Sequence, residues 1–211
     1  MTVALSRPPA TRELWLDAAY ELLISEGIEA VKIMSLAKKL NLTRTGFYWF
    51  FEDINELRRA MVHRWESRNT QNLLNSCDSH AVSICEALFN LMNCWLDPTL
   101  FDARLDLAIR NWARNDSDLE LRLRKADKLR VEAVIALFLQ HGFSQEQANV
   151  RGMTVIYTQI GYISMQVEEA PKERLERVRH YVELFAGTKP SIREVQKFLL
   201  RHSSSSNPLS Q

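Results

Sequence analysis

The fold is decided by one stretch of the chain, Leu36-Ala37-Lys38-Lys39-Leu40-Asn41-Leu42-Thr43-Arg44-Thr45-Gly46-Phe47-Tyr48-Trp49-Phe50-Phe51. Two short helical patterns meet in it at a three-residue turn, 41–43, and the second pattern runs into consecutive aromatic residues. No acidic residue occurs from position 30 to position 51, and the same segment carries these basic residues: Lys32, Lys38, Lys39 and Arg44. A polyanion can therefore approach this surface without meeting a negative charge.

This layout predicts a helix-turn-helix, in which one helix braces the next and the second enters the major groove of DNA. On the second helix, Phe47 and Phe51 are one turn apart and are expected in the core. Thr45 and Trp49 then share an outer face, with Arg44 and Tyr48 in the neighbouring row: Tyr suits a phosphate, Trp a sugar or thymine methyl, and Arg or Thr a base edge. Gly46 is a poor helix former and is explained if this helix must approach DNA closely.

Outside this stretch the chain predicts helices only. Its six prolines fall at the ends of periodic segments, and Gly27, Gly142 and Gly187 follow amphipathic runs as C-terminal caps do. No alternating strand pattern with a tight turn signal appears. Helices are expected over 11–26, 32–40, from 43 through the aromatic run, 53 to about 77, 81–95, 100–115, 117–142, 144–170, 171–186 and from 191 onward. The predicted class is all-α.

Four segments are expected from this pattern. Residues 1–10 form an N-terminal arm with Arg7, and residues 11–56 form the helix-turn-helix domain. Residues 57–202 form a longer helical domain, and the Ser-rich segment 203–211 has the composition of a disordered tail.

Charge and apolarity limit the classes of partner. The formal net charge of the 211-residue chain is only +1, so a DNA contact must be a local patch. The longest uncharged apolar stretch, 152–167, is too short and too polar to span a bilayer. The N-terminal residues lack the apolar run of a secretory signal, and the three cysteines, Cys77, Cys85 and Cys94, have no CxxC spacing. A reducing cytoplasm is the expected location, with the thiols in packing or, alternatively, in redox sensing.

The segment from about Thr11 to Trp65 resembles the DNA-binding head of the TetR-type transcriptional repressors. The resemblance rests on a long first helix ending at Gly27, the Leu36-Ala37 pair, the turn, and the order of Phe47-Tyr48, Phe51 and Leu57 that follows. It implies DNA contacts for the matching positions, which are Lys32, Thr43, Arg44, Thr45, Gly46, Tyr48 and Trp49. The chain departs from the family pattern at Asn41, Ile54 and Phe50, where the family commonly has Gly, Lys and His.

The resemblance also implies a homodimer that binds an inverted-repeat operator on double-stranded DNA, usually as a repressor, and is released by a small-molecule effector. The effector cavity is expected among aromatic, Met and polar residues of the second domain: Met92, Trp95, Arg110, Asn111, Trp112, Phe138, Tyr157 and Tyr162. Two glycines that permit close helix approach and an apolar stripe are expected at the dimer interface: Gly152, Gly161, Leu175, Val178, Val182 and Phe185.

Two other functions fit the same residues. One is a DNA-binding protein of this fold without small-molecule control, such as a nucleoid-associated or division regulator, and the other is a helical adaptor or enzyme with a relic head. No Ser/His/Asp set, metal-ligand spacing or Gly-rich phosphate loop occurs. We therefore expect a chain that is not an enzyme and takes no metal or cofactor.

Overall fold

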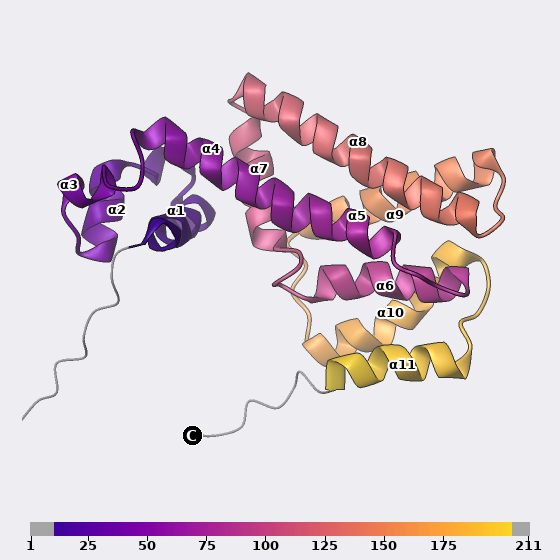
Figure 1. Ribbon diagram of the computed structural model, residues 1–211. Coiled ribbons are helices and arrows are strands. Elements are labelled where there is room, and N and C mark those ends of the chain that lie inside the picture. Colours follow the sequence, from indigo (N-terminus) through magenta and orange to yellow (C-terminus); the bar gives the residue numbers. More distant parts are fainter. Residues whose placement is uncertain (1–10, 204–211) are drawn as a thin grey trace, which may run out of the picture. The chain divides into compact units, whose positions relative to one another are not determined.

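The computed structural model describes residues 11–203, and within that range every regular element is a helix (Figure 1). The expected all-α class is confirmed. The described residues form two compact units: residues 11–65 with 104–120, and residues 66–103 with 121–203. The expected arm at 1–10 lies outside the described residues, as does the expected tail at 203–211 except for Ser203, which is the last residue of a helix.

The first unit contains the N-terminal helices and most of α7. Its elements are α1 (Arg12–Glu26), the 3-10 turn η1 (Ile28–Ala30), α2 (Ile33–Leu40), α3 (Arg44–Phe47), α4 (Ile54–Trp65) and α7 (Ala103–Ala113). The expected start of α1 is confirmed by its cap, because the Thr11 side chain accepts a hydrogen bond from the Leu14 amide at 3.1 Å. The expected aromatic core is confirmed as well: Trp15 meets Phe47 edge-to-face with ring centroids 5.3 Å apart.

Asn41 ends α2 in the left-handed conformation, with φ 51° and ψ 42°. Its amide donates to the Lys38 carbonyl at 3.0 Å, and the Leu42 amide donates to the Ala37 carbonyl at 2.8 Å. These bonds satisfy carbonyls that the end of a helix leaves free. Asparagine therefore serves at a position where the left-handed backbone favours glycine, because its side chain tolerates that conformation.

The helix α3 is shorter than the sequence pattern suggests. It ends at Phe47, and residues 48–50 form turns in which the Tyr48 amide bonds to Thr45 and the Phe50 amide to Phe47, three residues back. Gly46 weakens the helix, and bulky aromatic side chains lose rotamer freedom in one. Residues 48–50 of the aromatic run are therefore turns that follow α3 and are not part of the helix.

A buried carboxylate joins α4 to α7 inside the first unit. Asp106 is 0 % exposed, accepts a hydrogen bond from the Trp65 indole nitrogen at 2.9 Å and pairs with Arg110 Nε at 2.9 Å. A buried carboxylate keeps its charge at an acceptable cost only when such partners are present. Trp65 and Arg110 supply them here.

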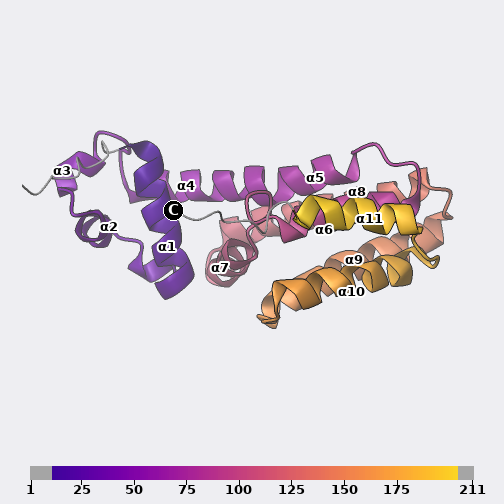
Figure 2. The same ribbon diagram turned by 90° about the horizontal axis from the view of Figure 1, so that it is seen from below.

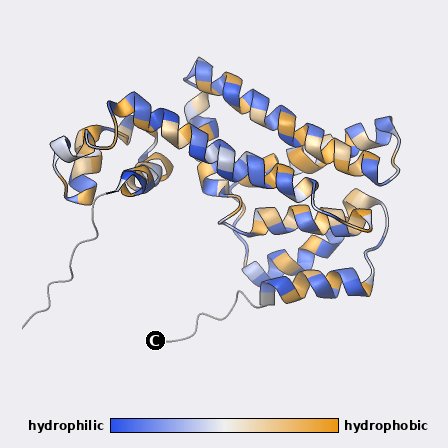
Figure 3. Ribbon diagram, in the orientation of Figure 1, coloured by the Kyte–Doolittle hydropathy of each residue, from blue (hydrophilic) through white to orange (hydrophobic). Residues whose placement is uncertain are grey.

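The second unit holds the remaining helices. They are the π-helical turn η2 (Glu66–Gln71), α5 (Asn72–Cys77), α6 (Ile84–Leu96), α8 (Ser117–Gln140, whose first turn belongs to the first unit), α9 (Gln145–Ser164), α10 (Pro171–Ala186) and α11 (Ile192–Ser203). The helix α6 is central, because it packs against α5, α10 and α11 (Figure 1). Apolar and polar residues alternate along these helices, as expected where one face of each helix is buried (Figure 3).

Helix boundaries in this unit follow the expected caps. Ser144 and Gln147 form a reciprocal capping box at α9, and Pro171 opens α10. The helix α9 ends at Ser164, however, and does not reach 170 as expected. Gln166 adopts a left-handed φ of 49°, and Ala170 is extended because it precedes a proline.

The expected fourth helix is confirmed, since every residue from Ile54 to Cys77 is helical. Residues 66–71 are wound as a π-helix, in which Asn69 is buried. The Asn69 side chain donates to the Asp102 carbonyl at 2.9 Å and accepts from the Asp102 amide at 3.1 Å. The loop before α7 is therefore tied to this turn within the second unit.

All three cysteines are buried and unbridged. Burial raises the pKa of Cys77 to about 12 and the pKa values of Cys85 and Cys94 to about 11. Thiols with such pKa values are protonated at neutral pH and are poor nucleophiles. Their surroundings match packing better than redox sensing.

Candidate nucleic-acid interface and ligand cavity

The turn into α3 is built by Thr43. Its side-chain oxygen accepts a hydrogen bond from the Gly46 amide at 3.1 Å, which caps the short helix. A Cβ added at Gly46 would meet only that oxygen, at 3.4 Å, an ordinary contact distance. No neighbour within the described chain therefore requires a glycine at position 46.

The aromatic run divides into anchors and exposed rings. Phe47 and Phe51 are buried and stacked, with ring centroids 5.3 Å apart, and Phe50 is half-buried. Tyr48 is 46 % exposed and Trp49 is 82 % exposed. The buried pair flanks the exposed rings in the sequence and anchors the backbone segment that carries them in the core.

The charges around these rings are unequal. Lys39 pairs with Glu21 at 2.9 Å, whereas none of Lys32, Lys38 and Arg44 has a carboxylate partner within residues 11–203. All three are exposed. Unpaired cations beside exposed aromatic rings are the combination that phosphate and base contacts need.

Six of the seven residues expected to contact DNA are exposed on α2, α3 and the turns that flank them. We call this set the α2–α3 surface; it consists of Lys32, Thr43, Arg44, Thr45, Tyr48 and Trp49. The seventh residue, Gly46, is half-buried between Thr45 and Phe47. Of the residues that depart from the family pattern, Ile54 is half-buried at the start of α4.

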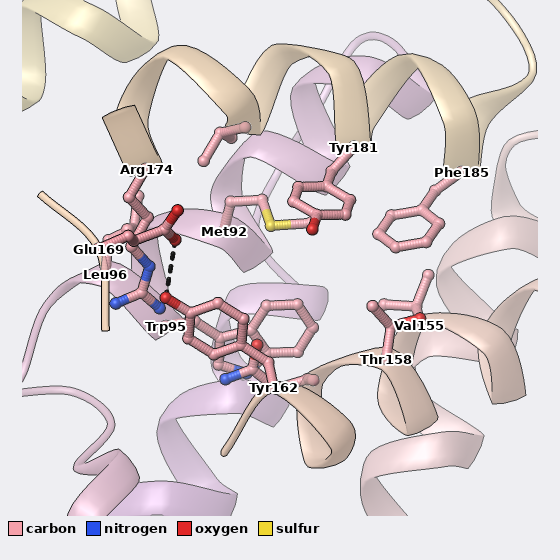
Figure 4. A pocket seen from close by; sticks show the side chains of 12 residues that line it. Met92, Trp95, Leu96, Val155, Thr158, Tyr162, Glu169, Arg174, Tyr181 and Phe185 are labelled. Carbon is pink, nitrogen blue, oxygen red and sulfur yellow. Dashed lines mark hydrogen bonds between the residues drawn. The ribbon is translucent and has the colours of Figure 1, made fainter. Parts of the chain in front are cut away.

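A narrow cavity lies in the second unit between α6, α9 and α10 (Figure 4). Its volume is about 50 Å³. Three residues expected at a ligand site, Met92, Trp95 and Tyr162, line it. The Tyr162 hydroxyl donates to Glu169 at 2.7 Å, and burial together with this bond raises the pKa of Tyr162.

The other residues expected at the ligand site do not line this cavity. Arg110, Asn111 and Trp112 belong to the first unit, where Arg110 pairs with Asp106. Phe138 is buried against Phe143, with centroids 5.2 Å apart, and Tyr157 is 61 % exposed.

Several residues that line the cavity were not expected there from the sequence. Val178 and Phe185, expected at the dimer interface, line the cavity, as do Arg174 and Glu169. The residues that α9 places in the cavity wall, 155, 158, 159 and 162, have the spacing of one helical face. This spacing is visible in the sequence and could have indicated which side of α9 lines the cavity.

The stripe expected at the dimer interface lies on the inner side of α10. Val178, Val182 and Phe185 are at most 6 % exposed within one chain, and Leu175 is half-buried. Gly152 does allow close helix approach, but the neighbour is α8: a Cβ there would lie 2.6 Å from Ile135 Cγ1. Gly161 has open space at its Cβ position.

A different apolar set faces outward on the same two helices. Val150 and Tyr157 on α9 are 62 % and 61 % exposed, and Leu184 on α10 is 69 % exposed. Figure 2 shows α9 and α10 side by side, and the Arg151 guanidinium donates to the Phe185 carbonyl between them. We call this set, with Gly161, the α9–α10 face.

None of the helices between residues 11 and 203 combines the length and apolarity that crossing a membrane requires. Nor do three or more His, Cys, Asp or Glu side chains in that range gather as a metal site would need.

The N-terminal helices match a known protein family. Residues 16–61 match the family described as bacterial regulatory proteins, tetR family. No curated protein matches the chain.

Solved structures resemble the fold as a whole. A TetR transcriptional regulator from Legionella pneumophila has 17 % identity and a TM-score of 0.64, over 84 % of this chain and 98 % of that one. The fatty acid degradation regulator FadR from Bacillus halodurans has 14 % identity and a TM-score of 0.62, over 86 % and 97 %. A TetR-like regulator from Rhodococcus sp. RHA1 has 17 % identity and a TM-score of 0.61, over 82 % and 95 %. The chain thus carries the helix-turn-helix head of the TetR family of transcriptional regulators on a TetR-like, all-helical fold.

Proposed function

We propose that this protein is a repressor that binds an inverted-repeat operator as a homodimer in the cytoplasm. Each subunit contacts the DNA through its α2–α3 surface. Thr45 and Trp49 read base edges and thymine methyl groups in the major groove. Tyr48 and Lys32 contact phosphates and set the register of the head on the duplex.

One observation carries the DNA contact: an 82 % exposed Trp49 beside a 46 % exposed Tyr48, on a surface with unpaired cations. Adjacent exposed aromatic rings lose favourable burial in a free monomer, so they indicate a surface that is covered in a complex. The lack of any packing reason for Gly46 supports the same conclusion, because a backbone that needs no glycine inside the protein can need one against DNA.

We propose the α9–α10 face as the dimer interface, in place of the inner stripe of α10. A single head reads only a few base pairs, and two heads related by two-fold symmetry match an inverted repeat. Val150, Tyr157 and Leu184 supply exposed apolar area, and the open position at Gly161 allows a partner helix to come close.

We further propose that the cavity between α6, α9 and α10 holds the effector that releases the operator. A ligand can do so only if it binds better to a conformation that does not fit the DNA. The aromatic and Met wall formed by Trp95, Met92, Tyr162 and Phe185 suits a small apolar molecule.

The volume of the cavity, about 50 Å³, also favours a second function. A cavity that holds only a few water molecules is compatible with a DNA-binding regulator of this fold that ignores small molecules. Ligand binding measured apart from DNA binding separates these two functions.

DNA binding is tested by fluorescence anisotropy, comparing duplexes from the DNA flanking the protein's own coding sequence with random duplexes of equal length. The proposal expects tighter binding to one flanking duplex at near-physiological salt. It also expects Lys32→Ala to weaken both kinds of duplex and to reduce the salt slope by about one unit. Equal affinity for all duplexes, with no effect at Lys32, would refute it.

A further inference from the structure

A buried donor without an acceptor lies in the wall of the cavity between α6, α9 and α10. Trp95 is 6 % exposed, and its indole nitrogen has no hydrogen-bond partner within residues 11–203. The side-chain nitrogen of Gln159, on the same wall, also has none there. Buried donors are nearly always paired, so two unpaired ones at one cavity indicate an absent acceptor.

Among the described residues, the one carboxylate in the cavity wall, Glu169, already has two partners. Glu169 Oε1 accepts from the Tyr162 hydroxyl at 2.7 Å (Figure 4). Glu169 Oε2 forms an ion pair with Arg177 Nη1 at 2.6 Å, although it accepts no hydrogen bond within residues 11–203. Neither the Trp95 nor the Gln159 nitrogen donates to Glu169, so a molecule that satisfies these two donors must bring its own acceptor.

One of the charged residues in the cavity wall has no ion-pair partner within residues 11–203. Arg174 lines the cavity and stacks 4.9 Å from the Tyr162 ring centroid. No carboxylate of the described chain forms an ion pair with Arg174, while Glu169 is neutralised by Arg177. One cation at the wall is thus left without a counter-charge, and an anionic head group would supply it.

The rest of the cavity wall is mostly apolar, and the cavity is small. Met92, Val155, Val178 and Phe185 are among the residues that line the cavity, whose volume is about 50 Å³. Such a space excludes a large or multiply charged ligand and has room for a group of a few heavy atoms, such as a carboxylate. The cavity is open on one side, so the chain or ring of a small acid projects through that opening.

We propose that this cavity binds a small apolar monocarboxylic acid, whose carboxylate accepts from the Trp95 indole and the Gln159 amide and pairs with Arg174. That such an acid acts as the effector rests on the proposed function of this cavity. Binding itself is measured on the full chain without DNA.

The probes are hexanoate and benzoate, each compared with the alcohol of the same skeleton, by isothermal titration calorimetry. The carboxylate is expected to bind at least tenfold tighter than its alcohol. Arg174→Gln should remove that difference, because the alcohol makes no use of the charge. Arg179→Gln is the matched control, since Arg179 is an exposed cation on the same helix that does not line the cavity.

Trp95→Phe provides a second test. This substitution removes the unpaired donor and keeps a ring, so the thermal unfolding midpoint without ligand should change little while carboxylate affinity falls at least fivefold. Trp15→Phe removes another buried indole nitrogen without a partner in the described chain, but in the first unit, and should leave carboxylate affinity unchanged.

The inference is overturned if neither acid binds up to its solubility limit, or if each acid binds no better than its alcohol. Binding that is indifferent to both Arg174→Gln and Trp95→Phe also overturns it. If the acids bind as expected and operator affinity does not change, the site stands and the effector role falls. If the acids fail and operator binding is intact, the DNA-binding function stands alone.

Discussion

Arg44 and Tyr48, one helical turn apart on the α2–α3 surface, are in direct contact. The Arg44 guanidinium donates a hydrogen bond to the Tyr48 hydroxyl at 3.2 Å and lies 5.9 Å from the ring centroid. A phenol that accepts from arginine still has its own proton to donate. The contact therefore leaves the Tyr48 hydroxyl able to donate to a phosphate oxygen.

Tyr48→Phe tests this role. The variant keeps the ring and loses the donor, so we expect operator and random duplexes to bind more weakly by about 1 kcal/mol each, with their ratio unchanged. Anisotropy titrations at several salt concentrations measure both affinities. A change in the operator-to-random ratio would instead place Tyr48 among the base contacts.

Gly46→Ala separates the stability of the head from its DNA contact. The added methyl group meets only Thr43 Oγ1 at 3.4 Å, and alanine favours a helix over glycine by about 1 kcal/mol. We expect an unfolding midpoint equal to or above that of the parent, together with weaker operator binding. Unfolding monitored by circular dichroism and DNA titration check the two parts; unaltered operator affinity would show that DNA does not approach this position.

The dimer interface is tested by Leu184→Asp. A charge on the α9–α10 face should produce monomers with unchanged helicity and weak operator binding, because Leu184 is 69 % exposed and contributes little to the packing of one chain. Analytical ultracentrifugation gives the mass. Ile192→Asp is the control, since Ile192 is a 77 % exposed apolar residue on α11. A Leu184 variant that remains dimeric would exclude this face.

Most helix ends could be predicted from the sequence, whereas the burial of the apolar stripe of α10 within its own chain could not. Caps are local, so Thr11, Ser144 and Pro171 could be recognised from a few neighbouring residues. A helical period shows that one side of a helix is apolar but does not say whether its own chain or a second chain covers it. Val182 is 0 % exposed and Leu184 is 69 % exposed, and no local rule distinguishes these two aliphatic residues.

The two candidate sites were predictable to different extents for a related reason. The α2–α3 surface lies within one short segment, so the faces of a single turn and helix specify it. The cavity gathers residues from α6, α9 and α10, and its polar atoms come together only through tertiary packing. Trp95 and Gln159 are 64 positions apart in the chain, and periodicity along one helix carries no information about such a pair.

Folding stability should depend on pH through His202. Burial lowers the pKa of His202 below its ordinary value of 6.5, Arg201 lowers it further, and Asp97 opposes them. The unfolded chain therefore binds the proton first as pH falls, so stability is complete above about pH 6.5 and declines below it. His202→Gln retains a partner for Asn93, whose side chain lies 2.7 Å from the His202 ring nitrogen, and should flatten this decline. Urea unfolding between pH 5 and 7 measures it; parallel curves for parent and variant would assign the effect to other groups.

The most direct test of DNA reading by the α2–α3 surface is selection of binding sites from a random double-stranded DNA library with the full chain and with Trp49→Ala. The account predicts that the parent enriches an inverted repeat whose half-sites are about one helical turn apart. It predicts that Trp49→Ala loses about 1–3 kcal/mol on that sequence and much less on random duplex. The account is contradicted if the parent enriches no sequence, or if Trp49→Ala enriches the same repeat with undiminished affinity.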